Sequence, residues 1–294
     1  MYDIKALYEA ESVQDACRLL TEHPEAQVIA GGSDVLVQVR EGKRAGKELV
    51  SIYMLDELRG ISIDKDENVR IGSLTSFSNI TKNPIIQEKV GVLGEAVNMI
   101  GGPQVRAIGT IGGNTCNGVT SADSASTLHA WEAIVEITGP DGVRYDKIKD
   151  FYIKAGTVDL NLGEIQTAIL IPKESYENCF GHYIKYGKRN ALEIANIGCS
   201  VNVRLSEDKK AFDRVRIAYG VAGPVPMRAP SAEAFINGKA VTKENIEQFG
   251  KEVLHDINPR ESWRGGKKFR EHMAIVMAQR ALRESIRKAG GEVR

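Results

Sequence analysis

Two clusters of glycine and small polar residues are the parts of this sequence best suited to chemistry, because such segments can bind phosphate. The first is IAGGSDVLV, residues 29–37, in which two glycines precede Ser33 and Asp34. The second is GGPQVRAIGTIGGNTCNG, residues 101–118. Where no side chain intervenes, successive main-chain N–H groups can converge on phosphate oxygens, and hydroxyl or amide groups complete the shell. The composition favours a diphosphate site, although tight turns use the same residue types.

The other chemical motifs of nucleotide and metal sites are missing from the sequence. Neither cluster carries the lysine of a triphosphate loop, and no G-x-G-x-x-G follows the first strand. Phosphate would therefore be held mainly by neutral donors, as a tightly bound flavin dinucleotide can be. The four cysteines form no C-x-x-C pair and the five histidines show no metal spacing, so we predict no metal ligand. Without a Ser-His-Asp or Cys-His arrangement, we predict no catalytic side chain.

The composition excludes several classes of partner. Lys+Arg and Asp+Glu both count 39, so the basic excess typical of nucleic-acid binding is missing, and an anionic membrane surface is equally disfavoured. No apolar run approaches the ~20 residues of a membrane helix. The N-terminus lacks the pattern of a signal peptide, and unpaired cysteines suit a reducing compartment, so we expect a cytoplasmic protein.

The periodicity of the chain predicts the elements that must position the two clusters. A helix over 12–24, capped by Ser12, and strands at 26–30 and 47–52 form a small α/β unit, with a further element at 34–40. The following part is predicted to contain hairpins at 60–77 and 133–148, helices at 91–101 and 121–133, and a strand at 164–172. The last part contains strands at 179–189, 198–208 and 212–223, then helices at 242–257 and 269–288. Strands followed by helices predict an α+β fold.

An ordered series of segments resembles the FAD-binding subunits of the molybdenum hydroxylases. The series is AGGSDVLV, SIYMLDELRGI, RIGSLTSFSNI, GGPQVRAIGTIGGN, CNGVTSADSAS, FGHYIKYGKRNALEIANIGC and SWRGGKKFREHM, and it spans nearly the full length. Within this family the chain looks most similar to the FAD-binding subunits of three-subunit bacterial xanthine dehydrogenases. The feature that favours them is TSADSA, since many relatives carry a Ser-Pro-Ala form there.

The resemblance implies a two-part fold. The first part, residues 1–176, would be an FAD-binding domain of the vanillyl-alcohol-oxidase or PCMH type, with α/β subdomains at about 1–56 and 57–176. The second part, residues 177–294, would be a C-terminal α+β domain like that of the CO dehydrogenase flavoprotein, with a three-stranded sheet and helices.

The resemblance also implies FAD as the cofactor and a set of residues that hold it. Residues 27–34 match a loop at the pyrophosphate, Asp123 an acceptor for the ribose hydroxyls, and Lys185 a cation near the flavin. Ile165 and Gln166 match a pair whose main chain meets the adenine side. The implied residues are Gln27, Val28, Ile29, Ala30, Gly31, Gly32, Ser33, Asp34, Val35, Gly101, Thr110, Ile111, Gly112, Gly113, Asn114, Cys116, Asp123, Ile165, Gln166 and Lys185.

Three of these residues have a purely structural alternative. Asp123 could cap the helix that begins near it. Lys185 lies in a strand pattern, and it could simply be an exposed lysine on an edge strand. Ile165 could belong to the core.

The implied function is electron transfer within a heterotrimer. Electrons would pass from a molybdenum-cofactor large subunit through the [2Fe–2S] clusters of a small subunit to FAD, and then to NAD⁺. A xanthine dehydrogenase of purine metabolism is the expected enzyme. Since this chain lacks the cysteine-rich insert of benzoyl-CoA-reducing relatives, we expect no cluster of its own. The alternatives are the FAD subunit of a nicotinate, carbon monoxide or other N-heterocycle hydroxylase, a stand-alone flavin oxidoreductase, and an assembly module without flavin.

Overall fold

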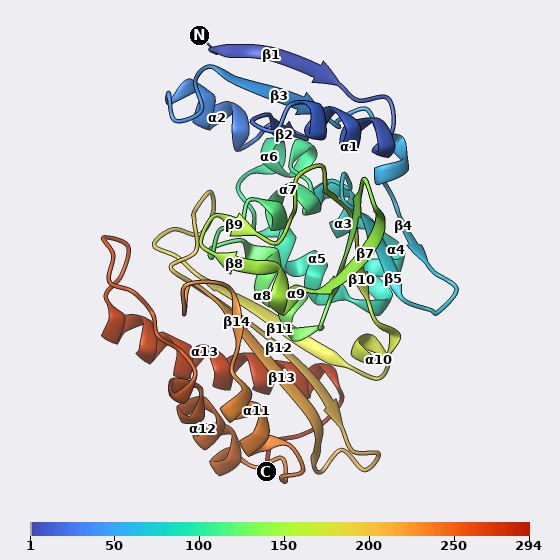
Figure 1. Cartoon of the computed structure of the whole chain (residues 1–294). Coiled ribbons are helices and arrows are strands. Elements are labelled where there is room, and N and C mark those ends of the chain that lie inside the picture. Colours follow the sequence, from blue (N-terminus) through green and yellow to red (C-terminus); the bar gives the residue numbers. More distant parts are fainter. Residues whose placement is uncertain (1) are drawn as a thin grey trace.

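The computed structural model describes residues 2–294 and arranges them in three layers, which follow one another from the N-terminus to the C-terminus (Figure 1). Each layer is built on one principal sheet, and three hydrophobic clusters largely follow the same division. Parallel α/β structure in the first layer and antiparallel sheets in the other two confirm the predicted α+β class.

The first layer is a three-stranded parallel sheet covered by one helix. Its elements are β1 (Ile4–Glu9), α1 (Val13–Glu22), β2 (Gln27–Ile29), α2 (Val35–Arg40) and β3 (Lys47–Ser51). The strand order is β1-β3-β2. The Ser12 side chain accepts a hydrogen bond from the Asp15 main-chain N at 3.0 Å, which confirms the predicted cap. The buried face of α1 contacts β3 and also β6 and β10 of the second layer, so this helix joins the two layers.

The second layer is a five-stranded antiparallel sheet with short helices around it. Its strands are β4 (Ile61–Ile63), β5 (Val69–Gly72), β6 (Ile134–Gly139), β7 (Gly142–Lys147) and β10 (Ile165–Ile171). Its other elements are η1 (Asp56–Leu58), α3 (Phe77–Lys82), α4 (Pro84–Lys89), α5 (Gly91–Asn98), α6 (Pro103–Ile108), α7 (Ile111–Cys116), α8 (Asp123–Ala130), α9 (Ile148–Phe151), β8 (Tyr152–Lys154), β9 (Thr157–Val158) and α10 (Lys173–Tyr176). The order β4-β5-β10-β6-β7 places β10 at the centre, and all its residues are buried. Both predicted hairpins are confirmed.

The second glycine cluster is more helical than the sequence indicates. The helix predicted at 91–101 already ends at Asn98, and Pro103 begins a separate helix, α6. The fixed φ of proline suits the first position of a helix, where no N–H is needed. Residues 111–116, expected as an open loop, form α7, with Thr110 as the capping residue.

The third layer is an antiparallel sheet covered by three helices. Its elements are β11 (Phe180–Tyr186), β12 (Ile197–Leu205), β13 (Phe212–Gly220), β14 (Met227–Arg228), α11 (Pro230–Ile236), α12 (Lys243–Glu252), η2 (Val253–His255) and α13 (Lys267–Lys288). The short β14 extends the predicted three-stranded sheet by a fourth strand. The helix α13 contacts β11 and β12, whereas α8 of the second layer contacts β12 and β13. The domain boundary expected after residue 176 falls between α10 and β11 and stays a prediction.

Candidate functional site

The two glycine segments, remote in sequence, lie against each other in the structure. A Cβ atom built on Gly31 would lie 1.7 Å from the carbonyl oxygen of Ile108, at the end of α6. Likewise, a Cβ on Gly112 would lie 2.5 Å from the Ser73 Cβ, at the end of β5. Glycine is therefore required at both positions because main chain or a short side chain occupies the space that a Cβ would need. The two segments form one site.

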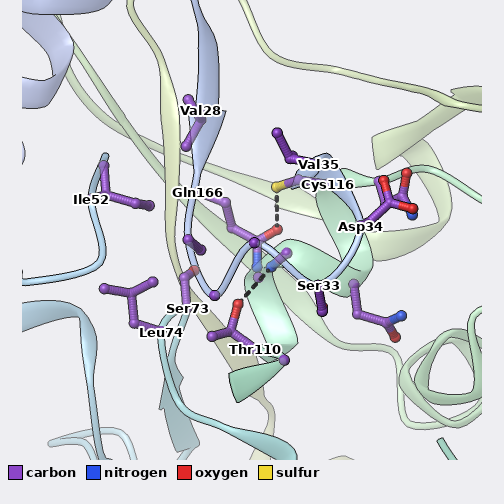
Figure 2. A pocket seen from close by; sticks show the side chains of 18 of the residues that line it. Val28, Ser33, Asp34, Val35, Ile52, Ser73, Leu74, Thr110, Cys116 and Gln166 are labelled. Atoms are coloured by element: carbon purple, nitrogen blue, oxygen red, sulfur yellow. Dashed lines mark hydrogen bonds between the residues drawn. The ribbon is translucent and has the colours of Figure 1, made fainter. Parts of the chain in front are cut away.

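A cavity of about 330 Å³ opens beside these two segments, and the start of the central strand β10 forms part of its wall (Figure 2). Its lining combines polar groups with apolar side chains such as Val28, Ile52 and Leu74, as is typical of sites for small molecules and cofactors. The predicted site residues that line it are Gln27, Val28, Ala30, Gly31, Gly32, Ser33, Asp34, Val35, Thr110, Gly112, Gly113, Asn114, Cys116, Ile165 and Gln166. The structure thus brings together most of the predicted set.

Five predicted residues do not line the cavity. Ile29 and Ile111 are buried in the hydrophobic interior. Gly101, with a φ of 47°, makes the turn between α5 and α6, and a Cβ there would contact Val105. Asp123 and Lys185 lie beyond the lining and bind each other. Their proposed contacts with FAD stay predictions.

The cavity also has lining residues that sequence reasoning missed. They are Arg44, Ile52, Ser73, Leu74, Phe77, Ile100, Val105, Gly109, Asn117, Gly156, Leu160 and Glu164. Val105, Gly109 and Asn117 belong to the second glycine cluster, although they were not among the implied residues. Most of the others are apolar or isolated residues of strands and turns, and no local sequence pattern marks them. Arg44 follows α2, the helix that comes directly after the first glycine segment. Only the folded chain places it in the cavity wall.

The first segment and the start of α7 differ in whether their main-chain N–H groups are already hydrogen-bonded. Within residues 2–294, the N–H groups of Gly31 to Asp34 donate to no main-chain acceptor. The N–H groups of Ile111 and Gly112 instead donate to the carbonyl oxygens of Thr75 and Ser73, at 3.1 and 2.9 Å. The N–H of Gly113 donates to its cap, Thr110 Oγ1, at 3.1 Å. The N–H groups at the start of α7 are therefore already used, whereas those of Gly31 to Asp34 are free to bind a ligand.

One cation lines the cavity within the described part of the chain. Arg44 donates hydrogen bonds to the side-chain carbonyls of Gln27 and Gln38, which are neutral and leave its charge uncompensated. Glu164 also lines the cavity, but Arg144 binds both of its oxygens at 2.8 Å and lowers the pKa of its carboxyl to about 2. Asp34 is exposed. An anionic ligand would thus meet Arg44 as its nearest uncompensated positive charge.

Asp123 and Lys185 form a buried ion pair. Lys185 Nζ lies 2.7 Å from Asp123 Oδ2, and the exposed fraction of each side chain is 7%. The Tyr183 hydroxyl donates to the other carboxylate oxygen at 2.7 Å, and Asp123 makes no capping bond at the start of α8. Burial raises the pKa of Asp123, and the charge of Lys185 opposes that rise. Lysines on edge strands are usually exposed. Lys185 lies on the edge strand β11, but its side chain is buried.

Cys116 is a hydrogen-bonded thiol in the wall of the cavity. Its sulfur donates to Gln166 Oε1 at 3.2 Å, and burial raises the pKa of the thiol to about 12. A protonated thiol is a poor nucleophile. No group of three or more His, Cys, Asp or Glu side chains that could hold a metal occurs within residues 2–294. Over the same residues, no helix combines the length and apolarity needed to cross a bilayer.

Comparisons with known proteins identify relatives over both parts of the chain. Residues 2–174 match the FAD binding domain in molybdopterin dehydrogenase, and residues 182–285 match the CO dehydrogenase flavoprotein C-terminal domain. The chain is 38% identical to the putative xanthine dehydrogenase FAD-binding subunit of Escherichia coli strain K12, with 100% of both chains covered. It is 30% identical to the carbon monoxide dehydrogenase medium chain of Hydrogenophaga pseudoflava, over 92% of this chain and 93% of the other. A solved carbon monoxide dehydrogenase of H. pseudoflava has a chain that superposes with a TM-score of 0.92 at 29% identity, covering 98% of this chain and 99% of that one.

Proposed function

The chain belongs to the FAD-binding subunits of the molybdenum hydroxylases, and from that premise we propose that it is the electron-transfer subunit of a xanthine dehydrogenase-like enzyme. FAD is its cofactor. The observation that supports xanthine is the 38% identity over the full length to a subunit of that name, against 30% for the carbon monoxide dehydrogenase chain.

The residues of the cavity fit a dinucleotide. The free N–H groups of Gly31 to Asp34 suit diphosphate oxygens, and the uncompensated charge of Arg44 suits their negative charge. The apolar side chains of Ile52, Leu74 and Ile165 offer a surface for a ring system. We assign the diphosphate to the first glycine segment on these grounds.

The bound cofactor supplies the redox chemistry, since FAD can accept electrons singly and release them in pairs. The chain binds and orients it through Gly31 to Asp34 and excludes water with its apolar lining. No side chain of the cavity is needed as an acid or base. The thiol of Cys116, with its raised pKa, stays protonated and takes no part as a nucleophile.

The partners that we propose are a molybdenum-cofactor large subunit and a small subunit with [2Fe–2S] clusters. NAD⁺ is the proposed electron acceptor, and the cytoplasm the proposed location. Membership of the family supports these partners, since its members include the medium chain of a carbon monoxide dehydrogenase.

The experiment is purification of the native complex through a tag on this chain, followed by analysis of molybdenum, iron and FAD. Anaerobic addition of xanthine should bleach the flavin, and NAD⁺ should restore its colour. A complex with Gly113→Leu in this chain is the control, because it should assemble without flavin. Bleaching by nicotinate or carbon monoxide and not by xanthine would reject xanthine as the substrate. Substrate turnover by this chain alone would reject the subunit role.

A further inference from the structure

Two buried polar atoms, one in each of two side chains of the cavity wall, lack hydrogen-bond partners. Within residues 2–294, six buried side-chain N or O atoms make no hydrogen bond, and two of them, Ser73 Oγ and Gln166 Nε2, belong to residues that line the cavity. Each residue is only 3% exposed. A buried polar atom without a partner destabilises the folded protein, so both atoms need a ligand or water to satisfy them.

The position of Ser73 is fixed by its main chain. Its N–H donates to the Thr167 carbonyl at 3.0 Å, and its own carbonyl accepts from Gly112 at 2.9 Å. These bonds tie the residue to the central strand β10 on one side and to α7 on the other. The hydroxyl is therefore held beside the second glycine segment, with its hydrogen bond still unused.

The Gln166 side chain is fixed by α7. Its Oε1 lies 2.7 Å from the Thr115 hydroxyl and 3.2 Å from the Cys116 sulfur, which leaves Nε2 free. Rotating the amide by 180° would exchange a free N–H donor for a free carbonyl acceptor, so either orientation leaves one polar atom unmatched. The side chain is thus ordered before any ligand binds, which reduces the entropy lost on binding.

We propose that Ser73 and Gln166 hydrogen-bond FAD through their side chains and determine how tightly it is held. Both groups are neutral, so they suit a hydroxyl, carbonyl or ring nitrogen of FAD, whereas Arg44 and the free amides of the first segment suit its phosphates. This assignment rests on FAD binding and is independent of xanthine and NAD⁺. It gives Gln166 a side-chain role in addition to the main-chain role implied by the resemblance, and it adds Ser73 to the site.

The test compares FAD affinity and the stability of the apoprotein in full-length Ser73→Ala and Gln166→Met. We expect the Kd for FAD to rise roughly three- to tenfold in each variant, as for the loss of one hydrogen bond. The Tm of Ser73→Ala without FAD should stay unchanged or rise, because an unsatisfied hydroxyl has been removed. This opposite effect on affinity and stability distinguishes a ligand contact from a structural residue. FMN and ADP, measured separately, assign each contact to the flavin or the adenosine half.

Ser285→Ala and Gln279→Met are matched controls away from the cavity. Ser285 is a buried hydroxyl that already donates to the Ala281 carbonyl at 2.7 Å, and Gln279 already donates to the Glu247 carbonyl at 3.2 Å. They should lower the Tm and leave the Kd for FAD unchanged.

A wild-type Kd in both cavity variants overturns the proposal while the FAD-binding role stands, and a change in one supports that residue alone. A lower apoprotein Tm for Ser73→Ala overturns its part, since the hydroxyl would then have a partner already. If the wild-type chain binds no FAD, this proposal and the proposed function fail together.

Discussion

Lys185 Nζ lies 2.7 Å from Asp123 Oδ2, and this contact joins the first strand of the third layer, β11, to the start of α8 in the second. Lys185 also donates to the Met99 carbonyl at 3.0 Å. The resemblance implies a contact with FAD for each residue separately, whereas the structure pairs them with each other. A buried pair of this kind is sensitive to the loss of one partner, because the other is left as an uncompensated charge.

Lys185→Met should therefore destabilise the apoprotein strongly. Removing one partner of a buried pair costs about 3–5 kcal/mol, and Asp123→Asn in addition should restore part of that loss. Unfolding in denaturant measures both. Lys173→Met is the control, since Lys173 pairs with Glu67 at the surface, at 2.6 Å, and its loss should have little effect. Equal effects of Lys185→Met and Lys173→Met would contradict the importance of the buried pair.

Gly113→Leu should give a folded protein that lacks FAD. A Cβ at Gly113 would meet only Thr110 Oγ1, at 3.0 Å, so a larger side chain would extend into the cavity. The Tm shows whether the variant is folded, and the absorbance of bound flavin shows whether it holds FAD. Gly91→Leu is the matched control, since no atom lies within 4 Å of a Cβ there and the residue is outside the cavity. Full flavin content in Gly113→Leu would remove Gly113 from the site.

Arg44→Gln should weaken FAD binding through loss of charge. We expect roughly a tenfold higher Kd at low ionic strength and a smaller difference as salt is added, because salt screens charges. Riboflavin, which has no phosphate, should bind the variant and the wild type alike. Lys43→Gln removes a neighbouring cation that pairs with Glu41 at 2.8 Å and does not line the cavity, so it should change nothing. A Kd that is equally raised for riboflavin would argue against a charge effect.

His129 should make the protein less stable in mild acid. Its Nδ1 donates to the Ala125 carbonyl at 2.7 Å, and burial lowers its pKa from 6.5 to about 4. Between these values the unfolded chain binds a proton that the folded chain does not, so the free energy of unfolding falls as the pH drops from 6.5 towards 4. Denaturant unfolding across this range measures the slope. His129→Phe should flatten it, and an unchanged slope would show that other groups control acid stability.

The order of elements and the family could be predicted from the sequence because both depend on local patterns. The cap at Ser12, the two hairpins and the buried run of β10 follow from residue types at fixed spacing, and they are confirmed. The cofactor FAD was implied by segments read in order and is confirmed by the family. The helix α7 within the second glycine cluster could not be predicted, because glycine lowers helix propensity.

By itself, the sequence determined an α+β chain of the FAD-binding family with two glycine segments suited to a dinucleotide. Only the tertiary structure decided that Gly31 lies against Ile108, that the amides of α7 are already used, and that Asp123 binds Lys185. It also brought Ser73, Arg44 and Gln166 to one cavity. The physical reason is that local patterns report on neighbours within a few residues, whereas these contacts join residues far apart in the chain and arise only when the layers pack.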